Sequence, residues 1–223
     1  MSDTLVHAED LSRSFIATGG DVVAVVDASF DIHAGDRIAL VGPSGSGKST
    51  LLHLIAGIDR PSQGAIGWPA FGTLDLLRPE RIRVAFQGPS LMPQLTVVEN
   101  VALPLLLAGM DEATARDASL RSLEDLNLSE VAQKLPSELS GGQLQRAGIA
   151  RALVGSPGLV LADEPTGQQD RAGGNAVLEA MFAAVLRLGA ALVVATHDAA
   201  VAARFGRSWS MRDGLLSEEG RRC

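Results

Sequence analysis

The sequence predicts an α/β fold with a mainly parallel β-sheet, a strand-rich part near the N-terminus and an inserted helical part. Two short apolar runs, residues 159–161 and 191–196, are typical of strands buried on both faces of a parallel sheet. Between them, helical spacing predicts the crossover helix that parallel strands require, at Leu178, Met181, Phe182 and Val185. A glycine-rich turn at residues 42–47, between a strand pattern and a helix pattern, is the third observation.

The first elements along the chain are β-rich. Residues 22–26, 29–32 and 37–41 have strand composition, and turn residues 34–36 separate the last two. After the glycine turn, apolar residues at i, i+3, i+4 and i+7 predict a helix with one buried face, formed by Leu51, Leu54, Ile55 and Ile58.

The middle of the chain changes character. Residues 61–79 are rich in loop-forming residues, residues 81–87 predict another strand, and the chain reads as helical from Val97 to about Val154. We therefore expect one domain over residues 1–223. Its helical subdomain, residues 88–154, would be inserted into a core made of residues 1–87 and 155–223.

Composition narrows the classes of function. The chain has 223 residues, 46% of them hydrophobic, which excludes a disordered protein. With 19 Lys and Arg against 26 Asp and Glu, the formal charge is −7. No broad positive field is available, so we expect no nucleic-acid partner and local binding of any phosphate.

The sequence gives little indication of an oxidising compartment, of secretion or of a membrane-spanning helix. The single cysteine, Cys223, permits no intrachain disulfide and suggests a reducing compartment. The N-terminus does not resemble a secretory signal. Glu179 and Arg187 interrupt the most apolar stretch, residues 177–194, so we expect no membrane-spanning helix.

The glycine turn matches the P-loop pattern, in which backbone N–H groups surround phosphates, a lysine reaches the terminal phosphates and a hydroxyl binds Mg²⁺. The helix that follows directs the positive end of its dipole at the anion. The alternative reading is an ordinary glycine-rich turn, which the preceding strand and following helix disfavour. The residues of the pattern are Gly42, Pro43, Ser44, Gly45, Ser46, Gly47, Lys48 and Ser49.

Two adjacent carboxylates, Asp163 and Glu164, end the apolar strand at residues 159–161. In P-loop hydrolases the strand-end acid holds Mg²⁺, and the next acid can polarise the attacking water. An isolated pair of this kind would be a solvated acidic turn, but the P-loop elsewhere in the chain favours catalysis.

A third motif, Ser140-Gly141-Gly142-Gln143 after Leu139, identifies a family. With the other two motifs, the sequence resembles ATP-binding cassette (ABC) ATPases, the motor subunits of ABC transporters, over nearly its whole length. The resemblance implies a P-loop NTPase core with an N-terminal antiparallel β subdomain and an inserted α-helical subdomain. It also implies the ligands ATP and Mg²⁺ and a second ATPase subunit, most simply another copy of the chain. Residues 140–143, the signature segment of the family, would contact the γ-phosphate held by the other subunit.

Further family positions match residue by residue. Gln87 resembles the glutamine that senses Mg²⁺ and the attacking water, His197 the histidine that contacts the γ-phosphate, and Phe15 the aromatic residue that stacks on adenine. The resemblance implies catalytic roles for Glu164, His197, Lys48 and Gln87. It implies Mg²⁺ contacts from Ser49, Gln87 and Asp163, and nucleotide contacts from Phe15, Gly42 to Thr50 and Ser140 to Gln143. Phe15 is alternatively an apolar edge residue.

Residues 87–104 are similar to the lipoprotein-releasing and macrolide-efflux branch of the family. This implies export or extraction through a separate membrane permease, with the ATPase bound at the cytoplasmic face of the cell membrane. Leu91, Met92, Leu95 and Val98 would either receive a permease helix or pack within the helical subdomain. Transmembrane signalling of the cell-division type, a non-transport ABC ATPase and a non-hydrolysing regulatory subunit are alternatives.

One position departs from the family pattern. The loop after Glu164 usually ends in Leu-Asp, whereas this chain has Gln169 before Asp170. The change bears on subunit contact. The chain also ends soon after the strand at residues 191–196, so we expect a minimal motor subunit.

Overall fold

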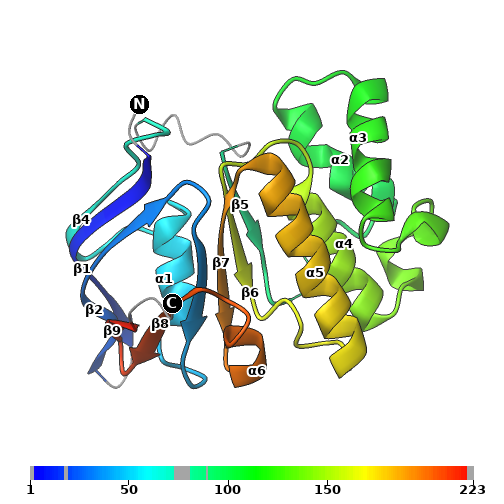
Figure 1. Cartoon of the computed structure of the whole chain (residues 1–223). Coiled ribbons are helices and arrows are strands. Elements are labelled where there is room, and N and C mark those ends of the chain that lie inside the picture. The colour runs from blue at the N-terminus through cyan, green and yellow to red at the C-terminus, as the bar shows by residue number, and fades with distance from the viewer. Residues whose placement is uncertain (1–2, 18–19, 73–80, 89, 220–223) are drawn as a thin grey trace. The chain divides into compact units, whose positions relative to one another are not determined.

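The computed structural model describes residues 3–17, 20–72, 81–88 and 90–219 (Figure 1). The chain forms two compact units: unit 1 comprises Met1–Leu77 and Ala191–Cys223, and unit 2 comprises Arg78–Ala190. Unit 2 contains the helices of the predicted subdomain, residues 88–154, together with two strands and one more helix. The finer division into core and helical subdomain stays a prediction. Cys223 lies outside the described residues.

Unit 1 is a mixed sheet with the strand order β4-β1-β2-β9-β8-β3-β7. The strand β3 pairs in parallel with β7 and β8, whereas β1 is antiparallel to β2 and β4, and β8 to β9. The predicted antiparallel N-terminal part and parallel core strands are therefore present. The elements are β1 (Thr4–Ala17), β2 (Gly20–His33), β3 (Arg37–Val41), α1 (Lys48–Ile55), β4 (Gln63–Gly67), β7 (Ala191–Thr196), α6 (Ala199–Ala202), β8 (Arg207–Arg212) and β9 (Leu215–Glu219).

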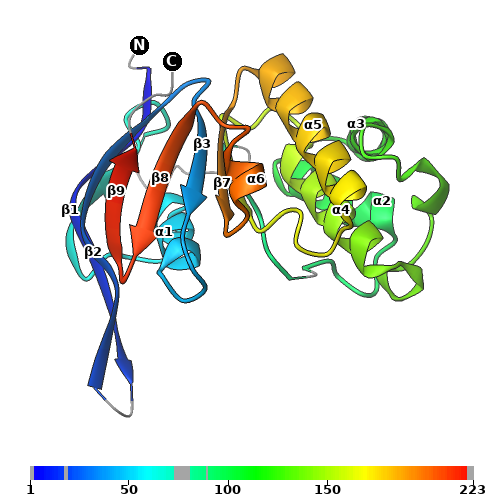
Figure 2. The same cartoon turned by 60° about the horizontal axis from the view of Figure 1, so that its bottom comes forward.

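The two N-terminal strands form a long antiparallel ribbon that extends beyond the rest of unit 1 (Figure 2). The predicted segments 22–26 and 29–32 are one continuous strand, β2, with a bend at Asp27, whose φ is 44°. The register between β1 and β2 shifts near this point, which explains why the alternation of polar and apolar residues breaks there.

The core of unit 1 confirms most of the predicted helix. Leu51, Leu54 and Ile55 of α1 are fully buried. Ile58 was predicted on the same face, but α1 ends at Ile55 and Ile58 is 57% exposed. The prediction was wrong there because the chain turns at Gly57, whose φ is 69°.

The C-terminal strands β8 and β9 were not predicted. Their sequences mix serine and charged residues with apolar ones, so neither gives a continuous apolar run. Trp209 of β8 is nevertheless fully buried, and its ring centroid lies 4.9 Å from that of Phe30 on β2. The strand at residues 191–196 is therefore followed by two further strands.

In unit 2, the strands β5 and β6 pair in parallel. Among the described residues, five helical segments lie between these two strands in the sequence. All five residues of β6 are buried, as predicted for residues 159–161, and the predicted strand 81–87 shortens to β5. The crossover helix α5 buries Leu178, Met181 and Val185, and leaves Phe182 half-buried. The elements are β5 (Ile82–Ala85), α2 (Val97–Leu107), α3 (Glu112–Glu124), η2 (Ser129–Val131), η3 (Pro136–Glu138), α4 (Gly141–Leu153), β6 (Leu159–Asp163) and α5 (Arg171–Leu188).

The described helices include none with the length and apolar character needed to cross a bilayer.

A buried amide orders the start of α2. Asn100 is completely buried, and its Nδ2 donates to the carbonyl oxygens of Met92, Leu95 and Thr96 at 3.0, 2.9 and 3.0 Å. Its Oδ1 accepts from the backbone N–H of Met92 at 2.6 Å. One side chain therefore holds the irregular segment that precedes α2, at the end of the stretch that begins with Gln87.

We predict that Asn100→Ala destabilises the protein by about 2–3 kcal/mol, because buried carbonyl groups lose their donor. Thermal or denaturant unfolding measures the change. Gln133→Ala, at an exposed glutamine, is the control and is expected to stay within about 0.5 kcal/mol of the parent. Equal stability of the two variants would contradict the role of Asn100.

Candidate active site

The glycine loop joins β3 to α1, and its backbone has no room for side chains at two positions. A Cβ at Gly47 would lie 1.9 Å from the carbonyl oxygen of Ala24, and φ at Gly47 is 103°. A Cβ at Gly42 would lie 2.2 Å from the carbonyl oxygen of Met211. Both clashes are with backbone atoms, which cannot move aside as a side chain could. Glycine is therefore required at both ends of the loop.

Two buried polar groups lie in this loop and directly after it. Lys48 is 7% exposed, and its Nζ donates to the carbonyl oxygens of Gly42 and Pro43 at 2.8 and 2.9 Å. The hydroxyl of Ser46 is buried and has no hydrogen-bond partner among the described residues. Ser49, in the first turn of α1, is exposed. The unsatisfied hydroxyl, the ammonium group and the start of a helix together fit an anionic phosphate.

The carboxylate pair lies at the end of β6 in unit 2. Asp163 and Glu164 are each 8% exposed, and Glu164 has a φ of 48°, a conformation that costs energy for a residue other than glycine. Gln145 of α4 supports this turn: its Nε2 donates to the carbonyl oxygen of Glu164 at 2.8 Å, and its Oε1 accepts from the N–H of Gln168 at 3.2 Å. The turn that carries the predicted base is thus held by a neighbouring helix.

The signature segment forms the start of α4. Ser140 is the N-cap: its Oγ accepts from the N–H of Gln143, while Oε1 of Gln143 accepts from the N–H of Ser140 at 2.9 Å. Gly141 is exposed and opens the helix. The capping box leaves N–H groups of the first turn directed outward at the positive end of the helix dipole, which suits a phosphate from outside the protomer.

Gln87 follows β5 and is exposed. Ser90 lies three residues after Gln87, and the half-buried guanidinium of Arg151 donates through Nη1 to its carbonyl oxygen at 2.8 Å and through Nη2 to its hydroxyl. Burial lowers the pKa of Arg151. Arg151 and Asn100 therefore hold the segment after Gln87 from opposite ends.

The remaining predicted nucleotide contacts lie in unit 1. His197 is exposed and directly follows β7, and Asp198 caps α6 by accepting from the N–H of Ala200 at 2.7 Å. Phe15 is 39% exposed, and the guanidinium of Arg13 lies 4.4 Å from its ring centroid. An exposed, electron-rich ring at this place is compatible with base stacking.

The predicted permease-facing residues divide between the two interpretations. Val98 is buried within unit 2, as packing requires, whereas Met92 is 47% exposed. Leu91 and Leu95 are intermediate. Only part of this set is thus available to another molecule.

The predicted residues are divided between the two units. Unit 1 holds the residues from Gly42 to Thr50 in the loop and first turn, with His197 after the neighbouring strand β7 and Phe15 on β1. Unit 2 holds Asp163 and Glu164 beside the helix that starts at Ser140, with Gln87 after the strand that pairs with β6. Sequence reasoning missed the supporting residues Asn100, Gln145 and Arg151, whose burial no motif reveals.

The donor set also suits Mg²⁺. No group of three or more His, Cys, Asp or Glu side chains gathers as a metal site within the described ranges. Mg²⁺ in nucleotide sites needs no such group, because one or two protein oxygens, phosphates and waters complete its shell. Within unit 1, the exposed hydroxyl of Ser49 is an oxygen ligand of the kind that Mg²⁺ accepts, and within unit 2 so is the buried carboxylate of Asp163.

Comparison with known proteins shows the family of the chain. A family model described as ABC transporter matches residues 25–167. The lipoprotein-releasing system ATP-binding protein LolD of Legionella pneumophila (strain Paris) is 39% identical, covering 97% of this chain and 98% of that protein. LolD of Idiomarina loihiensis is 36% identical, with coverage of 98% and 99%.

Two solved structures of an ATP-binding cassette match nearly the whole chain. The ATP-binding cassette MJ0796, in a dimeric post-hydrolysis state bound to ADP and Pi, matches with a TM-score of 0.92 and 32% identity, covering 98% of this chain and all of that one. A second dimeric structure of MJ0796 matches with a TM-score of 0.91.

The chain therefore belongs to the ABC transporter family. It is an ATP-binding and ATP-hydrolysing cassette of the LolD type, the motor subunit of a transporter.

We predict that Gly47→Ala destabilises the protein by about 3 kcal/mol or more, since the left-handed backbone and the clash with Ala24 act together. Thermal unfolding without nucleotide measures the loss. Gly206→Ala is the matched control, because a Cβ there meets nothing within 4 Å and the residue has no positive φ. A Gly47→Ala protein as stable as this control would disprove the packing argument.

Proposed function

We propose that the chain is the ATPase of a lipoprotein-releasing system. It would work as a pair of copies at the cytoplasmic face of the membrane and drive extraction of lipoproteins through a separate permease. The observation that carries the proposal is the 39% identity with LolD over 97% of this chain. The match covers nearly the whole length of both chains, so we expect this chain to have the same role as LolD.

In this proposal, the glycine loop binds the phosphates of ATP. Its N–H groups and the dipole of α1 neutralise the β- and γ-phosphates, and Lys48 exchanges two backbone carbonyl partners for phosphate oxygens. Phe15 stacks on the adenine. Ser49, Asp163 and Gln87 would hold Mg²⁺, which would neutralise part of the phosphate charge.

Hydrolysis would depend on Glu164 as the general base. Its carboxylate takes a proton from the attacking water, and its backbone carbonyl, held by Gln145, keeps the side chain at a fixed place on the turn. His197 contacts the γ-phosphate and stabilises its charge in the transition state. Each role follows from the family motif and the position of the residue at the end of a strand.

The second copy would complete the site. Ser140, Gly141 and Gly142 are available at the exposed start of α4, so one protomer presents helix N–H groups to the γ-phosphate bound by the other. ATP then favours the closed pair, and hydrolysis releases it. Binding energy from two nucleotides is thereby converted into movement of the attached permease.

We predict opposite defects for two substitutions. Lys48→Ala weakens ATP binding about tenfold or more, because a charge-assisted contact to phosphate is lost. Glu164→Gln preserves ATP binding but lowers kcat by about 10²–10⁴-fold and accumulates an ATP-bound dimer. Nucleotide titration, turnover and size-exclusion chromatography with light scattering separate these effects. Parental turnover by the Glu164→Gln protein would exclude Glu164 as the base.

The membrane partner can be tested with the same trapped protein. Tagged Glu164→Gln protein, purified from detergent-solubilised cells with ATP, is expected to retain an integral membrane protein with an extracytoplasmic domain, identified by mass spectrometry. Lys48→Ala protein is the control and should retain less. A permease that acts on another solute or in cell division would correct the substrate, and recovery of soluble partners alone would contradict transport.

A further inference from the structure

Gln169, the residue that departs from the family pattern, bonds to the signature helix of its own protomer. Its Nε2 donates to the carbonyl oxygen of Gly142 at 3.0 Å, and its Oε1 accepts from Nη1 of Arg146 at 3.4 Å. Both partners lie in the first two turns of α4. A leucine at this position offers neither a donor nor an acceptor, so this connection depends on the glutamine.

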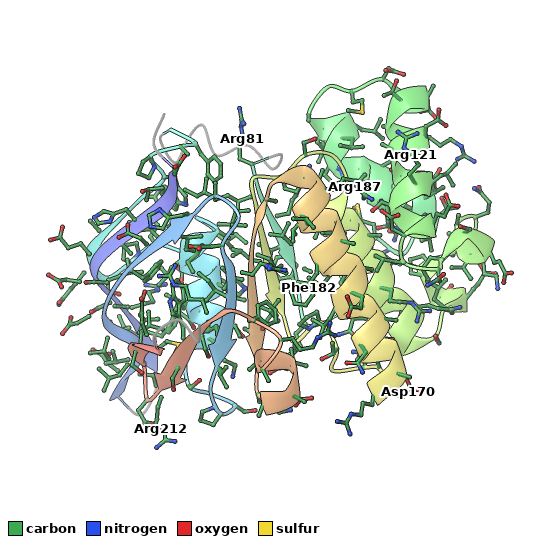
Figure 3. All side chains as sticks on the ribbon, in the orientation of Figure 1. Arg81, Arg121, Asp170, Phe182, Arg187 and Arg212 are labelled. Carbon is green, nitrogen blue, oxygen red and sulfur yellow. The ribbon has the colours of Figure 1, made fainter. Side chains whose placement is uncertain are left out.

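The surrounding backbone is shaped to admit the side chain. A Cβ at Gly173, in the first turn of α5, would lie 2.8 Å from Oε1 of Gln169 and 3.0 Å from Oδ1 of Asp170. A Cβ at Gly142 would lie 3.6 Å from Nε2 of Gln169. The amide of Gln169 therefore lies between the first turns of α4 and α5. Figure 3 shows Asp170 at the N-terminal end of α5, where its side chain caps the helix.

Arg146 adds a charge to this contact. Its Nη1 bonds Gln169, whereas its Nε is buried without a hydrogen-bond partner among the residues described. Loss of the Gln169 carbonyl would leave this half-buried guanidinium with fewer acceptors. The 3.4 Å bond between Arg146 and Gln169 therefore gives each of these two side chains a hydrogen-bond partner.

Two amides consequently connect α4 to the loop after β6. Gln145 of α4 bonds both the carbonyl of Glu164 and the N–H of Gln168, and the loop residue Gln169 bonds the carbonyl of Gly142 in α4. The loop that carries the predicted base is bound to the helix that carries the signature segment at two separate points. Displacement of one should therefore displace the other.

We propose that Gln169 is a positioning residue that fixes the first turn of α4 to the loop of Glu164, so that the signature N–H groups and the base of one protomer move as a single piece. This inference rests on the proposed function, in which the signature segment serves the site of the other copy. ATP bound in one site is then sensed at the other through the Gln169–Gly142 bond.

The decisive variant is Gln169→Leu, which restores the residue usual in the family and keeps a similar volume. We expect unchanged ATP affinity of the monomer, since the nucleotide loop is untouched. In a Glu164→Gln background, the dissociation constant of the ATP-bound dimer should rise about fivefold, the effect of one lost hydrogen bond. With Glu164 present, kcat should fall by a similar factor while the KM for ATP changes less.

Hydrogen exchange of the monomer tests the bond without ATP. In Gln169→Leu, peptides covering residues 140–147 should exchange about fivefold faster than in the parent, because the Gly142 carbonyl is no longer held. Gln169→Glu keeps an acceptor for Arg146 but loses the donor to Gly142, and should show the same faster exchange. Gln133→Leu, at an exposed glutamine of unit 2, is the matched control and should behave as the parent.

Each outcome decides a separate question. Parental exchange and parental dimerisation by both Gln169 variants would overturn the proposal. Absence of an ATP-driven dimer in the Glu164→Gln parent would overturn the proposed function, while the exchange rates would still test whether Gln169 holds α4. Faster exchange with unchanged dimerisation and kcat would show that the bond is structural only and would overturn the positioning role.

Discussion

The close approach of backbone to backbone at the glycine loop governs how this protein presents its nucleotide site. The carbonyl oxygens of Ala24 and Met211 lie where side chains of Gly47 and Gly42 would have to be. Strands β2 and β8 therefore confine the loop from two directions, and its polar groups are directed inward. Lys48 and Ser46 are buried as a result, and desolvation there strengthens any later contact with phosphate.

In unit 2, the predicted functional residues lie at the ends of strands and at the start of a helix rather than in a closed loop. Three amide side chains order these segments: Asn100 of α2 bonds the segment before its helix, Gln145 bonds the carbonyl of Glu164, and Gln169 bonds the first turn of α4. An amide both donates and accepts, so one such side chain can satisfy two backbone groups of a turn. A purely apolar side chain would leave those groups unpaired and the turn free to move.

Sequence alone predicted the parts of the fold that have strong periodicity. The strand at residues 191–196 matches β7 residue for residue, and the helical run from Val97 is present. The strands β1 and β4 and the C-terminal pair β8 and β9 were missed, and β4 lies within residues 61–79, which were predicted as loop. Their sequences mix polar, charged and apolar residues, so none of them gives a continuous apolar run. For the site, sequence motifs predicted the nucleotide contacts, which stay predictions. They did not reveal Gln145 or Arg151, whose bonding partners lie far away in sequence.

The departure at Gln169 illustrates why a single substitution is hard to interpret from sequence. By itself, a glutamine in place of leucine suggests a weakened apolar contact. In the structure, Gly173 leaves space for the amide, Gly142 offers a carbonyl, and Arg146 offers a donor. The substitution therefore exchanges nonspecific packing for directional bonds within one protomer. Directional bonds fix relative orientation more strictly than apolar contact does, which is the property required where a helix must deliver N–H groups to a phosphate.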